Sequence, residues 1–477
     1  MPAPAGRVIL LALASRAAVL TTMVLSDWAF SDLDSSARLQ GRPCATATMD
    51  AGPPSGSSPL LGVAVWDTVY FARVARCGYE TDKLNAFFPL LPAAMRGLAG
   101  AAGMKGLLPD EAAYLLAGLV VNVAAFCAAA LCLHRLGLRV LGAGGRAAKR
   151  GAGGAASRTA DLALLLFCFN PASVFYSTAY SEALFAAATW AGLLLLPDRH
   201  WAGVAALTAA AAARSNGILA AWFPLHKLAA AARRQGHLPA REAVRAALSC
   251  CAILAPYAAM QAHAYLAHCT VSPPGGEGGP PAWCAARPPS VYAFIQREYW
   301  DVGLLRFYRD PARLPMVLMS LPVAWLSVGG CWAYFAADWW RALTLGLYTR
   351  RHKPPAWLAA AEGTLQRWAA AARPRLRGRS GGKRRGLPQQ SAAASVLQRS
   401  NEAAPLVYHW ALMTAVALLA MHVNVATRFL SACPPLYWHA AEWAEAGGSI
   451  RARLLWLWCL SYIALGCLLF PNFYPWC

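Results

Sequence analysis

The sequence predicts an all-α, polytopic integral membrane protein, with roughly 8–10 transmembrane helices of the usual spanning length. Of its 477 residues, 58% are hydrophobic and only 14% are charged. The apolar residues form blocks of about 20, the length of helix that crosses a hydrocarbon core about 30 Å thick. In lipid, backbone N–H and C=O groups must pair within helices or closed barrels. The Leu, Ala and Val blocks lack the alternation of barrel strands, so helices are expected.

The formal net charge is +21, which could indicate binding to the phosphates of nucleic acid. The basic residues, however, gather in two loops, 135–158 and 337–404. By the positive-inside rule these loops are cytoplasmic. Membrane orientation therefore accounts for the charge, and no nucleic-acid partner is expected.

The first span is expected at 8–30, and it resembles a signal sequence that is not removed. Its apolar stretch exceeds the usual length, and no convincing cleavage site follows before Asp27. This span places the N-terminus in the cytoplasm and a large, mostly acidic loop, 31–110, in the lumen. The next span, 112–134, returns the chain to the cytoplasm.

Further spans are expected in pairs that enclose lumenal turns or loops. The block 201–231 carries Arg214-Ser215-Asn216-Gly217 at its centre. Because an arginine within a membrane is costly, we expect two short helices that meet at this turn, with Arg214 facing protein or water. The remaining spans are 160–176, 182–197, 246–266, 314–336, 405–428 and 452–470, which leave both termini cytoplasmic.

The chain is thus divided into two membrane regions and an insert. Residues 1–336 form the N-terminal membrane region and 405–477 the C-terminal one. The segment 337–404 between them is expected to be a cytoplasmic insert, partly disordered because Arg, Ala, Gly and Ser dominate its centre.

Short motifs for metals and nucleotides lack the context that they need. Asp32-Leu33-Asp34 and the glycines at 142–145 do not follow a strand in an alternating pattern of strands and helices. His263 and His268 miss the helical i, i+4 spacing and have no third ligand nearby. No metal is therefore expected. Cys269 and Cys284 bracket a loop placed on the oxidising side, where a disulfide could form, although spacing alone does not establish it.

The segment that best combines acidic, basic and aromatic residues is WDTVYFARVARCGYE, from Trp66 to Glu80, followed by FFPLLP at 87–92. Trp66, Tyr70, Arg73 and Cys77 share one face of a helix at the membrane surface. Two interpretations remain open from the residues alone. Asp67 is either the cap of an interfacial helix anchored by aromatic residues or a catalytic acid or base.

These segments resemble the GPI mannosyltransferase 2 family, and the resemblance recurs in order from residue 66 to the C-terminal end. The departures are the Ala-rich character, the insert 337–404 and the Pro/Gly-rich loop 271–281, all outside the similar blocks. Besides the two segments above, the blocks are Phe169-Asn170-Pro171-Ala172-Ser173-Val174-Phe175, Tyr180-Ser181-Glu182, Arg214-Ser215-Asn216-Gly217, Tyr299-Trp300-Asp301-Val302-Gly303, Arg428-Phe429-Leu430-Ser431, Pro434-Pro435-Leu436-Tyr437-Trp438 and Phe473-Tyr474-Pro475-Trp476.

The resemblance implies a helical bundle of the GT-C type in the endoplasmic reticulum membrane, with its active site in the lumen. Such an enzyme moves the second mannose from dolichol-phosphate-mannose to a Man-GlcN-phosphatidylinositol precursor in α-1,6 linkage. Both substrates are lipids, and membrane lipids surround the chain. No cofactor is implied, and a small membrane partner subunit is an open expectation.

A β-linked donor that gives an α product requires inversion and a general base. Asp67 is the expected base, because desolvation beside Trp66 would make the carboxylate a better proton acceptor. Arg214 and Arg428 are the candidates for stabilising the leaving phosphate, although each could instead be a helix-pairing arginine. Glu182 and Asn216 are expected to hold acceptor hydroxyls, and Tyr79, Tyr180 and Trp300 to stack on sugars. Trp66, Glu80 and Asn170 complete the expected substrate-binding set.

Two alternatives remain. A dolichol-phosphate-mannose enzyme with another acceptor would share the same site chemistry. A transporter would also place ionisable residues at broken helices, but it would show matching interruptions in two halves of the chain, which this sequence does not have.

Overall fold

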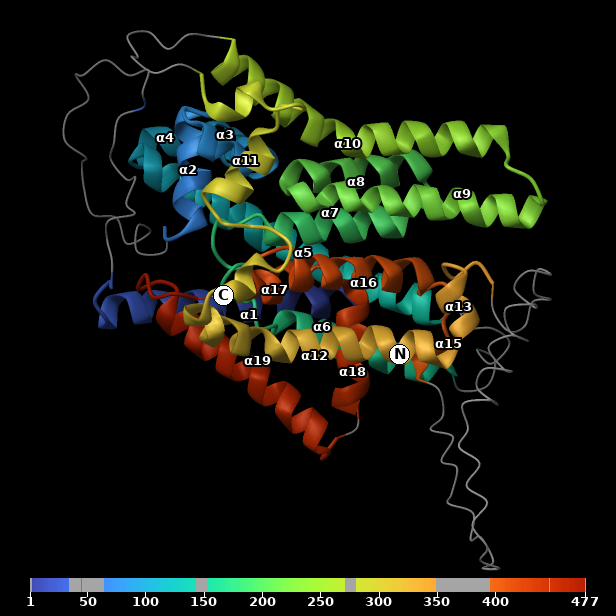
Figure 1. Cartoon of the computed structure of the whole chain (residues 1–477). Coiled ribbons are helices and arrows are strands. Elements are labelled where there is room, and N and C mark those ends of the chain that lie inside the picture. The colour runs from blue at the N-terminus through green and yellow to red at the C-terminus, as the bar shows by residue number, and fades with distance from the viewer. Residues whose placement is uncertain are drawn as a thin grey trace, which may run out of the picture.

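A computed structural model describes residues 2–33, 44, 64–142, 152–270, 280–348, 395–445 and 447–476, and within this part every regular element is a helix. Figure 1 shows most of the long helices lying side by side in one bundle. The prediction of an all-α protein is confirmed.

Five helices in the described part of the chain are long and apolar enough to cross a membrane, which confirms the polytopic class. Shorter helices lie among them, as expected for a chain with broken spans. The long helices are α1 (Ala5–Ala29), α5 (Asp110–Gly142), α10 (Ala240–Cys269), α12 (Leu314–Ala337) and α19 (Ile450–Leu469). The shorter ones are α6 (Ala152–Cys168), α7 (Glu182–Leu195), α8 (His200–Ala213), α9 (Trp222–Gln235), α16 (Ala404–Leu419) and α18 (Pro434–Glu445).

One end of the bundle is covered by short helices, on the left of Figure 1, and we call it the capped end. The opposite end carries α13 (Trp339–Leu343) and α15 (Val396–Arg399). The short helices of the capped end are α2 (Asp67–Cys77), η2 (Asp82–Ala86), α3 (Leu90–Ala101), α4 (Met104–Leu107), η5 (Ala282–Ala285), α11 (Val291–Glu298), η6 (Arg306–Arg309), η7 (Pro311–Arg313), η8 (Val423–Val425) and α17 (Ala426–Leu430).

The break predicted within 201–231 is confirmed. α8 ends at Ala213, a 3₁₀ turn η4 (Ser215–Ala221) follows, and α9 then leaves in a new direction. Gly217 allows this turn, because a Cβ there would lie 2.4 Å from Ala211 Cα. The backbone of η4 therefore packs directly on the last turn of α8.

Three predicted boundaries are wrong. The span 160–176 ends earlier, because α6 stops at Cys168 and turns occupy 169–181. The span 405–428 also ends early, since α16 stops at Leu419 and η8 and α17 follow. The predicted lumenal loop before 452–470 is instead α18, a helix whose first eight residues are buried.

Because α18 leads the chain away from the capped end, α19 runs back toward it. Glu445 at the end of α18 pairs with Arg158 near the start of α6, at 3.2 Å. Beyond α19, Asn472 donates to Ser26 at the far end of α1, at 2.9 Å. The start of α1 lies elsewhere, where Ala3 donates to Asp161 at 3.3 Å. The two ends of the described chain therefore lie near opposite ends of α1, and the predicted location of both termini in the cytoplasm stays a prediction.

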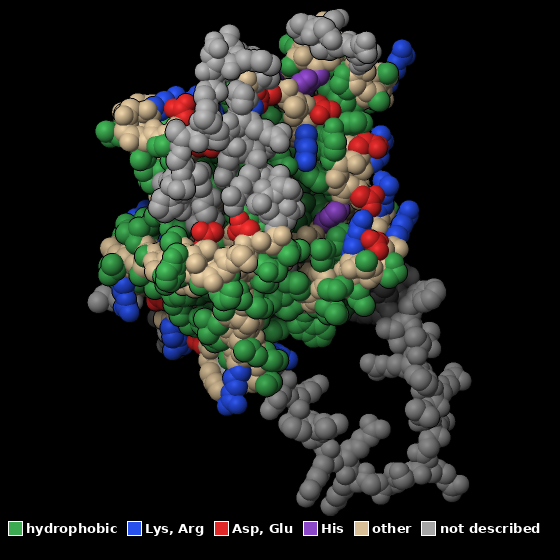
Figure 2. All heavy atoms as spheres, turned by 90° about the vertical axis from the view of Figure 1, so that its left-hand side faces the viewer, with side chains coloured by type: hydrophobic (Ala, Val, Ile, Leu, Met, Phe, Trp, Pro, Cys, Tyr) green, Lys and Arg blue, Asp and Glu red, His purple; other side chains and the backbone are tan. Residues whose placement is uncertain are grey.

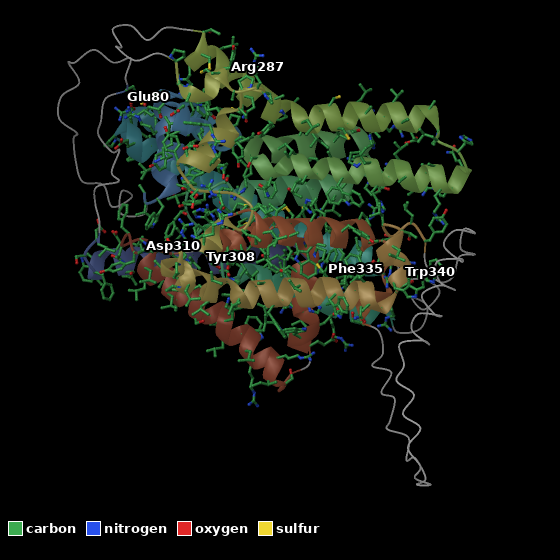
Figure 3. All side chains as sticks on the ribbon, viewed as in Figure 1. Glu80, Arg287, Tyr308, Asp310, Phe335 and Trp340 are labelled. Carbon is green, nitrogen blue, oxygen red and sulfur yellow. A yellow bond between two sulfur atoms is a disulfide. The ribbon has the colours of Figure 1, made fainter. Side chains whose placement is uncertain are left out.

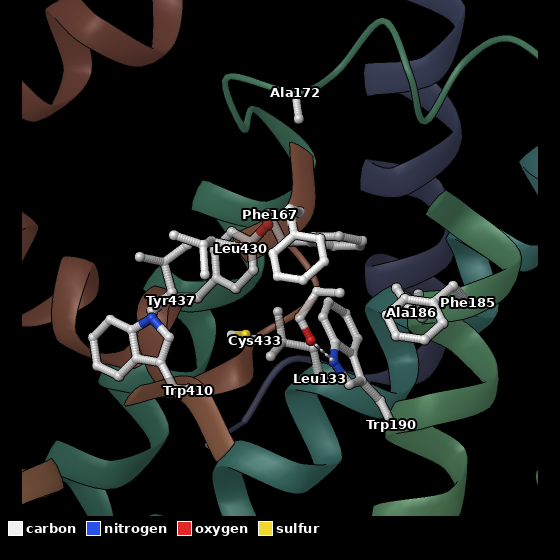
Figure 4. Packing of buried hydrophobic residues seen from close by; sticks show 14 of the residues in the cluster. Leu133, Phe167, Ala172, Phe185, Ala186, Trp190, Trp410, Leu430, Cys433 and Tyr437 are labelled. Carbon is white, nitrogen blue, oxygen red and sulfur yellow. Dashed lines mark hydrogen bonds between the residues drawn. The ribbon is translucent and has the colours of Figure 1, made fainter. Parts of the chain in front are cut away.

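Aromatic side chains join α5, α6, α7 and α18 in the core (Figure 4). The ring of Phe167 lies 4.9 Å from that of Trp190 and 5.5 Å from that of Tyr437. The Trp190 indole donates to the Ala432 carbonyl at 2.8 Å. Because lipid is as apolar as these side chains, close packing and hydrogen bonds stabilise this core.

A buried arginine holds the turns between α6 and α7, a role that the sequence did not reveal. Arg16 of α1 is fully buried and donates at 2.8 Å each to the carbonyls of Cys168 and Ser173 and to the Ser177 hydroxyl. These acceptors satisfy the charged group within the bundle. The turns that carry Tyr180 are thereby fixed to α1.

Two disulfides lie at the capped end. The pair Cys269–Cys284, considered from the sequence, joins the end of α10 to η5. The pair Cys44–Cys77 was not anticipated. Of the insert 337–404, the flanks form α13 and α15, whereas 349–394 lie outside the described residues.

Candidate active site

A cavity of about 240 Å³ opens at the capped end. Figure 2 views this end and shows acidic, basic and histidine side chains among the hydrophobic ones. Four parts of the chain supply most of its lining: α2, the turn after α8, α11 with the residues after it, and the segment after α16. In that order they contribute Asp67 and Phe71; Arg214, Ser215 and Asn216; Tyr292, Gln296, Trp300 and Val302; and Met421, His422, Val425, Arg428 and Phe429. The remaining lining residues are Ala86, Phe87, Phe88, Tyr180, Ser181 and Ala213.

Asp67 is the first residue of α2 and is held from two sides. Its backbone N–H donates to the Tyr180 hydroxyl at 2.9 Å. Its Oδ2 accepts from Arg428 at 3.0 Å. Trp66 precedes it with a φ of 55°, an uncommon conformation for a residue other than glycine. This bend turns the start of α2 toward the cavity.

Glu182, only 2% exposed, lies between the two arginines predicted for phosphate binding. Its Oε1 forms an ion pair with Arg214 and lies 3.7 Å from Arg428 Nε. Asp67, Arg428, Glu182 and Arg214 therefore form a row of alternating charge. Burial without such pairing would be costly for each of these groups.

The row keeps Arg428 charged. Burial acts to lower the pKa of Arg428, but the charges of Asp67 and Glu182 outweigh it and raise the pKa. The guanidinium also lies over the Phe175 ring, 5.2 Å from its centroid. Burial, with a contribution from Asp67, raises the pKa of Tyr180 well above its ordinary value, so its hydroxyl stays protonated.

The structure brings together seven of the predicted site residues. Asp67, Tyr180, Arg214, Asn216, Trp300 and Arg428 line the cavity, and Glu182 lies directly behind the arginines.

The other four predicted site residues lie outside both the cavity lining and the row of charges. The Trp66 indole donates to the Phe470 carbonyl at 3.2 Å and anchors α2 to the end of α19. The Tyr79 hydroxyl donates to the Phe87 carbonyl at 2.8 Å. Glu80, labelled at the edge of the capped end in Figure 3, pairs with Arg73 at 2.6 Å. Asn170 is buried and used in a turn, where it donates to Phe167 and accepts from Ala172. The cavity lining does not include these four residues, and their binding of substrate stays a prediction.

Several lining residues were missed from the sequence, chiefly His422 and the α11 residues Tyr292 and Gln296. The expected span 405–428 placed His422 inside a helix, and α11 was not predicted at all. The available signal was His422-Val423-Asn424, because two polar residues interrupt the apolar block there.

One group of potential metal ligands occurs among the described residues, Cys44, Cys77 and Glu80. Its two sulfurs are joined in a disulfide, and none of the three residues lines the cavity. This group offers no thiolate ligand, and the expectation of a reaction without a metal stays a prediction.

Comparisons with known proteins extend over nearly the whole chain. The family model described as "Mannosyltransferase (PIG-V)" matches residues 5–477. A protein named "GPI mannosyltransferase 2" from Drosophila pseudoobscura pseudoobscura is 28% identical over 508 residues, with 98% of each chain covered. Proteins named "GPI alpha-1,6-mannosyltransferase 2" are 31% identical in Mus musculus, covering 82% of this chain and 76% of theirs, and 30% in Homo sapiens, covering 80% and 73%. No solved structure matches the chain significantly.

Proposed function

Because this chain belongs to the PIG-V family of mannosyltransferases, we propose that it adds the second mannose of the GPI anchor in α-1,6 linkage. The donor is dolichol-phosphate-mannose, and the acceptor is a Man-GlcN-phosphatidylinositol glycolipid. The observation that carries the proposal is the cavity in which Asp67 meets Arg214 and Arg428. It combines a base with positive charge for a phosphate, as transfer from a lipid phosphate requires.

Asp67 is the general base of this reaction. Inversion at the donor carbon needs one in-line attack by an acceptor hydroxyl, whose proton must be removed as the transition state forms. Arg428 uses only Oδ2 of the carboxylate, and Oδ1 makes no hydrogen bond to the described residues. Oδ1 is therefore available to take the proton.

Arg214 and Arg428 stabilise the phosphate that leaves. Glu182 holds both guanidinium groups at one wall of the cavity. Paired N–H donors stabilise a phosphate that gains charge during transfer. We propose on this ground that the arginines supply the positive charge and that no metal or cofactor takes part.

The capped end faces the lumen of the endoplasmic reticulum. The opposite end of the bundle carries basic residues such as Arg139, Arg233 and Arg234 near helix ends, which favours a cytoplasmic location. Both disulfides lie at the capped end, which suits an oxidising compartment. The N-terminal end is then cytoplasmic, and the segment after α19 is lumenal.

The proposal is tested by incubating membranes that contain the protein with labelled dolichol-phosphate-mannose and identifying the labelled lipid. The expected product is a dimannosyl GPI precursor that an α-1,6-specific mannosidase cleaves. A transporter would give no labelled glycolipid. An enzyme with another acceptor would label a different lipid, such as a dolichol-linked oligosaccharide, and would contradict the proposed acceptor.

A further inference from the structure

We propose that His422 contacts the substrate, with its Nε2 accepting a hydrogen bond from a hydroxyl of the acceptor sugar. The proposal rests on the proposed function, since it assumes a glycolipid acceptor in the cavity. By binding another hydroxyl of the same sugar, His422 positions the hydroxyl that Asp67 deprotonates.

The imidazole of His422 has a ring nitrogen without a hydrogen-bond partner among the described residues. His422 follows the end of α16 and lines the same cavity as Asp67 and Arg428. Its Nε2 is buried and has no hydrogen-bond partner in the described part of the chain. Buried polar atoms are nearly always hydrogen-bonded, so a group at this position in the cavity is expected to meet a ligand.

Neighbouring residues also lie against the imidazole ring of His422. The backbone of Trp300 lies beside the imidazole of His422 and acts to raise its pKa. The Phe307 ring packs against the imidazole, with centroids 4.9 Å apart. A neutral imidazole with its proton on Nδ1 has a lone pair on Nε2. We infer that Nε2 accepts hydrogen bonds within the cavity.

The charges around the ring favour this neutral form. Burial, together with the charge of Arg313, lowers the pKa of His422 below its ordinary value, while the Trp300 backbone and Asp301 act in the opposite direction. Arg428 is the other charged group nearby on the same segment and lines the cavity. At neutral pH, His422 is thus an acceptor for a hydroxyl and would repel a phosphate oxygen.

A complementary donor lies in the same cavity. The Asn216 Nδ2 is also buried and without a partner among the described residues. Trp300 and Gln296 add an aromatic face and an amide to the lining. An acceptor, a donor and an aromatic face are the groups that recognise a sugar, whereas the two arginines suit the donor phosphate.

The test compares His422→Asn with His422→Gln in the purified, detergent-solubilised enzyme. The Gln amide oxygen can occupy the place of Nε2, whereas the Asn oxygen occupies that of Nδ1. With a synthetic Man-GlcN-phosphatidylinositol acceptor, we expect H422N to raise the KM for acceptor about 10-fold, as loss of one buried hydrogen bond predicts. H422Q should stay within about 3-fold of wild type by the same scale, and the KM for donor should not change in either variant.

Equal KM values for acceptor in H422N and H422Q would overturn the proposal, as would a rise confined to the KM for donor. A thermal denaturation scan of both variants separates loss of folding from loss of binding. As a second readout, acidification below pH 6.5 should raise the acceptor KM of wild type, because protonation converts Nε2 to a donor, and should not do so in H422Q. A pH effect of equal size in both would also contradict it. Product formation by wild type tests the proposed function separately.

Discussion

At the scale of single residues, the site depends on how four charges neutralise one another. Asp67 and Glu182 alternate with Arg428 and Arg214, and Glu182 is almost fully buried. A buried ion pair contributes little net stability, yet removal of one partner leaves an uncompensated charge that costs much more. The row thus keeps the arginines charged and in place before a phosphate arrives.

Asp67→Asn should abolish most mannose transfer while the fold is retained. The Asn amide oxygen can still accept from Arg428, but it cannot take a proton. We expect the kcat to fall by about 10²- to 10⁴-fold, the contribution typical of a general base, in an assay with labelled donor. Asp198→Asn is the control, because Asp198 pairs with Arg139 at an exposed site of the opposite end. Near-normal turnover in D67N would exclude Asp67 as the base.

Glu182→Gln should destabilise the protein by leaving two arginines without their shared counter-charge. The expected loss in free energy of unfolding is about 3–5 kcal/mol, as for other broken buried pairs, and it would appear as a lower midpoint in thermal denaturation. Glu242→Gln is the matched control. Glu242 pairs with Arg245 on one helix at a more exposed site, so its loss should cost at most about 1 kcal/mol. Similar midpoints for the two variants would contradict this account of Glu182.

At the scale of elements, breaks between helices bring the functional residues into the cavity. The turn after α8 presents Arg214 and Asn216, and the end of α16 at Leu419 presents His422 and Arg428. Backbone groups freed at such breaks are tolerated in a membrane protein where they line a cavity or are covered by protein. The polar wall of the site thus consists largely of interruptions in apolar helices.

Gly217→Ala should distort the turn between α8 and α9. The added Cβ would lie 2.4 Å from Ala211 Cα and 2.6 Å from its nitrogen, and backbone atoms cannot move aside as a side chain can. We expect a loss of about 1–3 kcal/mol, typical of overpacking, together with reduced activity because Arg214 and Asn216 shift. Gly97→Ala in α3 is the control, since its Cβ would meet nothing within 4 Å. A G217A variant as stable and active as G97A would show that the turn is not tightly packed.

At the scale of the whole molecule, α18 decides at which end of the bundle the described chain ends. It runs inside the bundle, pairs with α6 through Glu445 and Arg158, and turns into α19, which leads the chain back to the capped end. The end of α19 then supports the site, since Phe470 accepts from the Trp66 indole.

Engineered glycosylation sites should report this arrangement. An Asn-x-Ser/Thr sequon inserted after Ala286, at the capped end, should be glycosylated in microsomes, because glycosylation occurs in the lumen. Sequons inserted after Asp198, in the turn between α7 and α8, and after Gly448, in the turn between α18 and α19, should remain unmodified. Each outcome is read as an endoglycosidase-sensitive change in gel mobility. Modification at Gly448 would mean that α18 does not return the chain as described.

The sequence by itself determined the class of the protein and most of its helices. Apolar blocks such as 112–134 and 452–470 are predictable as helices from their own sequence. A segment in lipid must form its backbone hydrogen bonds internally, and a helix does so. The break at Arg214 was predictable for the same reason, since the cost of an arginine within a membrane is a local property.

Only the tertiary structure decided which residues meet. Asp67 and Arg428 are 361 positions apart, and neither pattern nor spacing states that they form an ion pair. The helix α18 was not predicted from the sequence, because Pro434-Pro435 and the polar residues after them are typical of a loop. Burial against α6 and α12 makes a helix favourable there. Asn170 and Trp66 were predicted as site residues, but their side chains bond to backbone groups around the site. His422 lines the cavity because α16 ends at Leu419, before the predicted end of the span. Local chemistry specifies helices, but contacts between distant segments depend on packing, which only the folded chain supplies.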